Sequence, residues 1–229
     1  MSQKVRFKSD QTFSQQCYEQ LKQEIIDGTL QPGQKIKTAH IKERFDIGQS
    51  PIREALSRLV SLGLVDVADN KGFRVAPLSE ENIRDTYHTF ARIENLALAL
   101  AIEHGDDAWE AGIVGALYQL ERVETRQKKE VDLEQWIGAN YNFHIALIVG
   151  CNSPVLLDVR KSLYMKFDRF CRLGFQGIQE SLTNNHHEHK ELAAAVIKRD
   201  SKKAQEIMSQ HILGALDQVV EKLKKQKLI

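Results

Sequence analysis

One stretch near the N-terminus constrains the fold more than any other: SPIREALSRLV, residues 50–60. Its apolar residues recur at intervals of three and four, which predicts a helix with a single apolar face. Ser50, Arg53 and Ser57 lie on the opposite face. Arginine and hydroxyl side chains on a short, anchored helix suit contacts to base edges in a DNA major groove, but an ordinary helix with a solvated face would show the same pattern.

The segments before this stretch predict two more helices. Apolar spacing indicates a first helix that ends at Gly28, a residue type common just after a helix C-terminus. Pro32 and Gly33 then turn the chain, and residues 39–45 predict a second, short helix. The stretch at 50–60 is therefore expected to be the third helix of a three-helix unit.

The segment after the stretch predicts a β-hairpin. Residues 64–67 and 73–75 alternate apolar and polar side chains as half-buried strands do, and the sequence DNKG between them is a strong turn signal. Three helices followed by a hairpin predict a winged helix-turn-helix. Lys71 and Arg74 are expected at the wing, where they would contact DNA phosphate or the minor groove.

At this point the run from Ile25 to Ser79 resembles the DNA-binding domain of the GntR family of bacterial transcription regulators. The resemblance is carried by Ile25-Ile26-x-Gly28, Pro32-Gly33, Ser50-Pro51-Ile52-Arg53-Glu54-Ala55-Leu56, Gly63-Leu64-Val65, Gly72-x-x-Val75 and Ala76-Pro77-Leu78-Ser79. It implies DNA contacts from Gln49, Ser50, Arg53, Ser57, Lys71 and Arg74. The family usually has Arg where this chain has Gln49. Because Gln prefers adenine and Arg prefers guanine, we expect an operator that differs from the family's common half-site.

The rest of the chain predicts helices and no strand. Helical spacing runs over about 80–103, then from 107, from 132 to about 150, from 154, over about 185–199, and from 200 to about 225. Six helices of this length predict an antiparallel bundle. The expected fold is therefore mainly α, with a winged helix-turn-helix at 1–78 and a six-helix bundle at 79–229.

Histidines in the second half could converge on a metal. Asn140 and His144 are four residues apart and share one helix face, while His189 and His211 lie on the fifth and sixth predicted helices. Imidazole ligands suit zinc, nickel, iron or copper. Isolated histidines more often form a single hydrogen bond or face water, which is the expectation for the remaining five: His40, His88, His104, His186 and His187.

Residues 79–225 resemble the FCD effector domain of the FadR subfamily, in its six-helix, VanR-like branch. The residues that carry this resemblance are Asn140-Tyr141-Asn142-Phe143-His144, Glu188-His189-Lys190 and His211. It implies a divalent transition metal, zinc or nickel, held by Asn140, His144, His189 and His211, although Asn140 stands where the family has Asp. It also implies a small organic-acid effector. The family's effector-binding Arg is replaced here by Phe90, which leaves Arg92 either as a displaced effector-binding residue or as a plain surface residue.

Cysteine usage and the absence of long apolar runs argue against a secreted or membrane-spanning protein. The net charge is +1, and the cysteines, Cys17, Cys151 and Cys171, are odd in number with no Cys-x-x-Cys spacing. This pattern fits free thiols in a reducing cytoplasm. We find no signal-peptide pattern at the start, and no apolar run approaches the roughly 20 residues that span a membrane.

These observations together predict a cytoplasmic, homodimeric regulator that binds a palindromic operator in double-stranded DNA. Repression relieved by the effector is expected from the family resemblance. Two alternatives are a metal-dependent helical enzyme and a helix-turn-helix module that docks protein. The sequence lacks the Glu-x-x-His pairs, the His-Glu-x-x-His zinc motif and the Gly-x-Ser-x-Gly elbow of common enzyme classes. A salt-dependent DNA-binding assay would distinguish the docking module.

Overall fold

The computed structural model describes residues 12–68, 72–125, 133–175 and 181–229. The chain divides by contacts into two compact units. The first, here called the N-terminal unit, contains Met1–Ile83 with Tyr164–Phe175 and Val219–Ile229. The second, the helical unit, contains Arg84–Leu163 and Gln176–Gln218.

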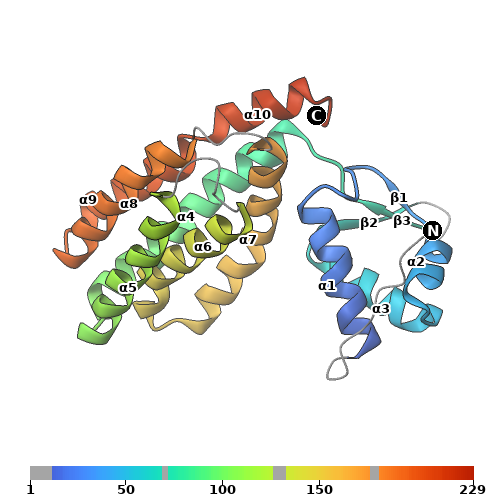
Figure 1. The fold of residues 1–229 in the computed structure, drawn as a ribbon, viewed down its shortest axis with the longest axis horizontal. Coiled ribbons are helices and arrows are strands. Elements are labelled where there is room, and N and C mark those ends of the chain that lie inside the picture. The colour runs from blue at the N-terminus through green and yellow to red at the C-terminus, as the bar shows by residue number, and fades with distance from the viewer. Residues whose placement is uncertain (1–11, 69–71, 126–132, 176–180) are drawn as a thin grey trace. The chain divides into compact units, whose positions relative to one another are not determined.

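The N-terminal unit has the predicted order of helices and strands (Figure 1). Its elements are α1 (Phe13–Ile26), β1 (Lys35–Ile36), α2 (Thr38–Phe45), α3 (Gln49–Ser61), β2 (Val65–Ala68) and β3 (Gly72–Val75). The strands form an antiparallel sheet in the order β1-β3-β2. Phe73 of β3 pairs with Val67 on one side and with Ile36 on the other. The predicted winged helix-turn-helix is thus confirmed, with β1 added to the wing as a third strand.

An apolar core holds these elements together. Gly28 and Gly33 have φ values of 80° and 76°, so both turns use the left-handed backbone region that favours glycine. The turns direct the buried faces of α1, α2 and α3 toward one another. The fully buried members of the core include Cys17, Leu21, Ile25, Ile52, Ala55, Leu56, Leu59, Leu64, Val65 and Val75.

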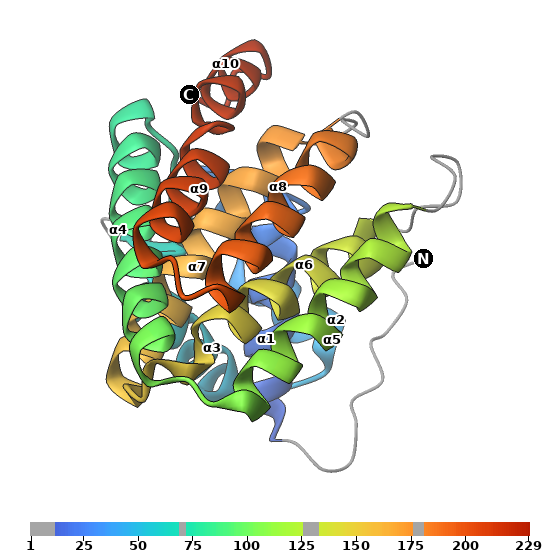
Figure 2. The ribbon, with the colours of Figure 1, turned by 90° about the vertical axis from the view of Figure 1, so that its left-hand side faces the viewer.

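The second half of the chain is helical, as predicted (Figure 2). Its elements are α4 (Glu80–His104), α5 (Asp107–Glu124), α6 (Leu133–Ile148), the 3-10 turn η1 (Val149–Cys151), α7 (Pro154–Phe175), α8 (Ser181–Ile197), α9 (Ser201–Leu213) and α10 (Leu216–Lys225). In the helical unit, α5 packs against both α6 and α8, and α8 packs against α9. None of the helices in the described ranges is long and apolar enough to cross a membrane.

Two glycines in this half of the chain have different effects. The helix expected from 200 to about 225 is divided into α9 and α10 at Gly214, a residue type that disfavours helix interiors. Gly174, by contrast, lies inside α7. A Cβ at Gly174 would come within 2.8 Å of Val219 Cγ1, so this glycine permits close packing rather than a turn.

Trp109 fixes α5 against the end of α6. Asp106 caps α5 by accepting a hydrogen bond from the Trp109 backbone amide at 2.8 Å. The indole Nε1 donates to the carbonyl of Ala146, also at 2.8 Å. A Cβ at Gly105 would lie 2.0 Å from Trp109 Cε3, so the indole occupies space that only glycine leaves open. The start of α5 is thereby held against α6, which carries part of the site described below.

Candidate functional site

The first candidate site is the exposed face of α3. Ile52, Ala55, Leu56 and Leu59 are buried and anchor this helix in the core. Arg58 contributes to the same anchorage, because its Nη1 donates to Gln15 Oε1 at 2.7 Å and its guanidinium lies 3.9 Å from the centre of the Tyr18 ring. One arginine of α3 is thus engaged with α1.

The residues predicted to contact DNA lie on the other side of α3. Gln49, Ser50, Arg53 and Ser57 are all exposed, and Gln49 and Ser50 are the first two residues of the helix. Arg74 is exposed on β3. Lys71 lies outside the described residues. The N-terminal residues of a recognition helix are the ones that reach base edges, so the exposed polar face has the position that such contacts require.

The second candidate site is a buried histidine cluster in the helical unit. His144 of α6, His189 of α8 and His211 of α9 come together there, and one nitrogen of each lies within 4.8 Å of the others. The centre of the His211 ring is 5.1 Å from that of His144 and 4.8 Å from that of His189. His144 and His189 are buried, and His211 is partly so. The structure therefore brings the three predicted histidines together from three helices.

Burial favours the uncharged form of two of these histidines. It lowers the pKa of His144 well below the ordinary value, with further lowering by the neighbouring His211, His189 and Arg160. Burial also lowers the pKa of His189, against an opposing hydrogen bond to Glu124. Neutral imidazole is the form that coordinates a metal, so burial favours the coordinating form of His144 and His189.

Two buried polar atoms at this site have no hydrogen-bond partner among the described residues. The Nε2 atom of His189 and the Oδ1 atom of Asn140 are buried, and neither has a hydrogen-bond partner in the part of the chain that the structure describes. Such atoms are rare in folded proteins unless they bind something else. The three imidazole nitrogens form a donor set that fits a divalent transition metal such as zinc or nickel, and Asn140 lies one turn before His144 on α6.

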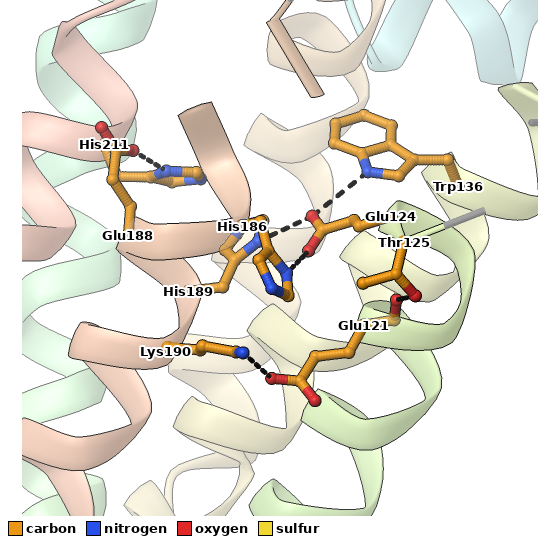
Figure 3. Close-up of polar contacts among 9 residues, drawn as sticks. All are labelled: Glu121, Glu124, Thr125, Trp136, His186, Glu188, His189, Lys190 and His211. Carbon is orange, nitrogen blue, oxygen red and sulfur yellow. Dashed lines mark hydrogen bonds and ion pairs between the residues drawn. The ribbon is translucent and has the colours of Figure 1, made fainter. Parts of the chain in front are cut away.

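Carboxylates behind the cluster orient two of the histidines (Figure 3). Glu124 of α5 contacts Nδ1 of His189 at 3.0 Å and Nδ1 of His186 at 2.9 Å. Glu188 contacts Nδ1 of His211 at 2.8 Å. Burial alone would raise the pKa of Glu124, but hydrogen bonds from the two histidines and Trp136 hold this pKa below its ordinary value. The hydrogen bond from His211 likewise lowers the pKa of Glu188. Neither carboxylate was predicted from the sequence to be part of the site.

A buried ion pair, also missed from the sequence, lies in the same unit. Arg160 of α7 donates from Nε to Glu94 Oε1 of α4 at 2.6 Å, and both side chains are almost fully buried. The guanidinium lies over the rings of Phe90 and Tyr141, at 5.4 and 5.3 Å from their centres. The positive charge of Arg160 acts on His144. Position 90, where the family's effector-binding Arg was expected, is thus covered by an arginine from another helix.

Arg92 and most of the remaining histidines lie on the surface. Arg92 is exposed, and it follows Phe90 and precedes Glu94 by two residues, which is about 200° around a helix. Arg92 therefore does not share the face of α4 that carries Glu94 toward Arg160. Of the histidines expected to be ordinary, His40, His88, His104 and His187 are exposed, and His186 hydrogen-bonds to Glu124.

Two family models match this chain. Residues 13–75 match the model described as bacterial regulatory proteins, gntR family. Residues 85–214 match the FCD domain, which includes all three clustered histidines. The two matches follow one another along the chain without overlap.

Named relatives agree with these matches. The chain is 37% identical over 202 residues to the HTH-type transcriptional repressor GlaR of Escherichia coli K12, covering 86% of this chain and 90% of that protein. It is 27% identical over 197 residues to the HTH-type transcriptional regulator McbR of the same strain, covering 84% and 87% of the two chains.

Solved structures support the fold. Escherichia coli McbR/YncC superposes with a TM-score of 0.76 at 23% identity, covering 92% of this chain and 98% of that one. A metal-free FCD domain, from the regulator TM0439, superposes with a TM-score of 0.53 at 18% identity, covering 66% of this chain and 99% of that one. The helical unit is therefore similar to a fold already seen in an isolated FCD domain.

Proposed function

The chain belongs to the gntR family of bacterial regulatory proteins and carries an FCD domain. We propose that it represses transcription from a palindromic operator until a small organic acid binds it. It is a transcription regulator and not an enzyme, as its family and its named relatives are. The name of its relative GlaR, a transcriptional repressor, supports repression over activation. Operator binding would place the protein in the cytoplasm.

We assign DNA binding to residues 1–78. The observation that carries this assignment is the exposed polar face of α3, formed by Gln49, Ser50, Arg53 and Ser57 above a buried apolar face. Arg74, with Lys71, would contact phosphate from the wing. Gln49 would read adenine at a position where an arginine reads guanine.

Selection of binding sites from random DNA tests this assignment. The unaltered protein should select a palindrome, and Gln49→Arg should change the preferred base at one symmetric pair of positions. An identical consensus for both proteins would show that Gln49 reads no base. Binding that hardly weakens between 50 and 200 mM salt would instead favour a module that docks protein, because DNA affinity at several phosphates falls by orders of magnitude over this range.

We assign effector binding and dimerisation to residues 79–229. His144, His189 and His211 would hold a divalent transition metal, zinc or nickel, with Asn140 as a fourth donor. When bound, the metal would supply positive charge that grips a carboxylate. Arg160 replaces Arg92 in our proposal as the protein cation that faces the effector, because Arg160 is buried beside the cluster whereas Arg92 is exposed.

Elemental analysis of protein purified without a histidine tag tests the metal centre. We expect zinc or nickel in the unaltered protein and a large loss of metal in His144→Ala and His211→Ala. Asn140→Asp should retain the metal more strongly, since a carboxylate adds the attraction of a negative charge. Unchanged metal content in both histidine variants would disprove the site.

We also propose that the regulator acts as a homodimer. One winged helix covers only a few base pairs, so two copies would occupy two half-sites about one helical turn apart or a multiple of that distance. Val155 and Val159 are exposed on one face of α7 and offer an apolar surface for such contact. Light scattering at micromolar concentration should report a dimer, and a monomer with and without operator DNA would contradict this proposal.

A further inference from the structure

Glu124 is a buried carboxylate that contacts the histidine cluster. Its side chain is 1% exposed. It receives hydrogen bonds from His189 Nδ1, His186 Nδ1 and, at 3.4 Å, from the indole Nε1 of Trp136. The contacts come from α8 and α6, so one carboxylate at the end of α5 joins three helices (Figure 3).

The chemistry of a carboxylate determines which nitrogen of His189 is left for other partners. An ionised carboxylate only accepts hydrogen bonds, so His189 must carry its proton on Nδ1. In a neutral imidazole the lone pair is then on Nε2. That atom is buried and has no hydrogen-bond partner among the described residues, and the His189 ring is 5.8 and 4.8 Å from the rings of His144 and His211. Glu124 therefore presents an Nε2 lone pair inside the cluster.

We propose that Glu124 is a positioning residue of the metal centre, which fixes His189 in the tautomer and orientation that allow Nε2 to coordinate the ion. This inference rests on the metal centre proposed above and extends it beyond the ligands. A carboxylate that accepts the second N–H of a metal-binding histidine fixes the ring and makes it a better ligand, and removal of such a partner typically weakens metal binding.

A purely structural role is the competing explanation, since Glu124 also connects α5 to α8. The same two helices offer a matched control. Glu121 lies one turn earlier on α5 and pairs with Lys190 of α8 at 3.2 Å, where both side chains are partly exposed. Glu121 also joins α5 to α8 by a carboxylate, but its partner is not in the histidine cluster.

Metal titration of three full-length proteins separates the two roles. The unaltered protein, Glu124→Gln and Glu121→Gln are stripped of metal and titrated with zinc against a competing chelator, and thermal unfolding of each metal-free protein is recorded. We expect zinc affinity to fall roughly 10- to 100-fold in Glu124→Gln and to stay within about twofold in Glu121→Gln. Equal zinc affinity in all three proteins would overturn the positioning role. Equal losses in both variants would overturn it too, because they would reflect only the helix contact.

The tautomer of His189 gives a second readout that a structural role would not move. Long-range proton–nitrogen NMR spectra of the metal-free protein at neutral pH should show His189 protonated on Nδ1, and Glu124→Gln should shift this population toward Nε2. Protonation of His189 on Nε2 in the unaltered protein would contradict the proposal, even if the variant unfolds. Failure of the unaltered protein to bind either zinc or nickel would disprove the metal centre itself, and the inference with it. Failure of the metal centre is therefore read from the unaltered protein, and failure of the positioning role from the variants.

Discussion

The two units differ in whether their candidate binding residues are exposed or buried. In the N-terminal unit, the candidate contact residues of α3 are exposed, and the core beneath them is apolar. In the helical unit, His144 and His189 are buried and His211 is partly buried, beside carboxylates and an arginine. A binding surface can therefore be altered in the first unit without loss of stability, whereas in the second unit binding and stability are expected to change together.

One ion pair in each unit makes the difference measurable. Glu24 of α1 pairs with Arg44 of α2, but the Arg44 side chain is 34% exposed. Glu94 and Arg160 are 0% and 1% exposed. Water reaches the first pair through the partly exposed Arg44 guanidinium, and it does not reach the second pair. Burial, rather than the presence of an ion pair, should decide how much each pair matters.

The largest effect is expected from Arg160→Leu. This change leaves a buried carboxylate without its guanidinium and should lower the free energy of unfolding by about 3–5 kcal/mol. Chemical denaturation of the metal-free protein measures it. The double variant Glu94→Leu/Arg160→Leu should recover much of the loss, because no lone charge remains. A loss below about 1 kcal/mol in the single variant would mean that the helical unit tolerates buried charge far better than this comparison implies.

Arg53→Ala tests whether DNA binding can be lost in the N-terminal unit without loss of stability. It should weaken operator binding by roughly 1–3 kcal/mol, while the free energy of unfolding changes by no more than about 0.5 kcal/mol. Fluorescence anisotropy with labelled operator and denaturation of the same sample measure the two values. Arg58→Ala is the matched control on the same helix, since its contacts with Gln15 and Tyr18 make it part of the fold. A destabilised Arg53→Ala protein would contradict the separation of binding from stability.

The ion pair of the N-terminal unit should be worth less than that of the helical unit. We expect Arg44→Met to lower the free energy of unfolding by roughly 1–2 kcal/mol, between the values typical of exposed and buried pairs. The Arg44 guanidinium lies over the Phe45 ring, 4.8 Å from its centre, and methionine places an apolar side chain of similar length there. A loss as large as that of Arg160→Leu, measured in the same denaturation series, would show that burial does not decide how much each ion pair stabilises the fold.

The smallest effect concerns Cys17, which lies beside this pair. Burial raises the pKa of Cys17 to about 11 from an ordinary value of 9.0, opposed by the Arg44 charge and assisted by that of Glu24. The unfolded chain therefore loses the thiol proton at lower pH than the folded chain, so stability falls as pH rises above 9. Between pH 8 and pH 10 we expect the stability advantage over Cys17→Ala to shrink by about 1 kcal/mol. A constant difference across this range would show that the thiol does not resist ionisation.

The N-terminal unit was largely predictable because its information is local. The spacing of Ile52, Ala55, Leu56 and Leu59 determines which face of α3 is buried, and Arg53 follows on the opposite face by helix geometry alone. Turn residues such as Gly28 and Gly33 gave the ends of the elements. Arg58 was the exception, since its contacts with α1 join residues 43 apart in the sequence.

The helical unit was predictable in its elements and only partly in its site. The three histidines were found through spacing and family resemblance, yet Glu124 and Arg160 were missed because their partners lie about 65 residues away. One signal was available. Glu94 occupies a core position of α4, three and four residues before the buried Ala97 and Leu98, and a charged residue at such a position normally has a buried partner.

The hydrogen bond between Trp136 and Glu124 links the fluorescence of a tryptophan to the histidine cluster. The chain has two tryptophans, and the indole of Trp136 is one contact removed from His189 through Glu124. Occupancy of the histidine cluster should therefore alter the emission of Trp136, while Trp109 hydrogen-bonds to a backbone carbonyl of α6. Intrinsic fluorescence of the unlabelled protein would then follow the loading of the centre in real time, and Trp109→Phe would leave Trp136 as the single emitter.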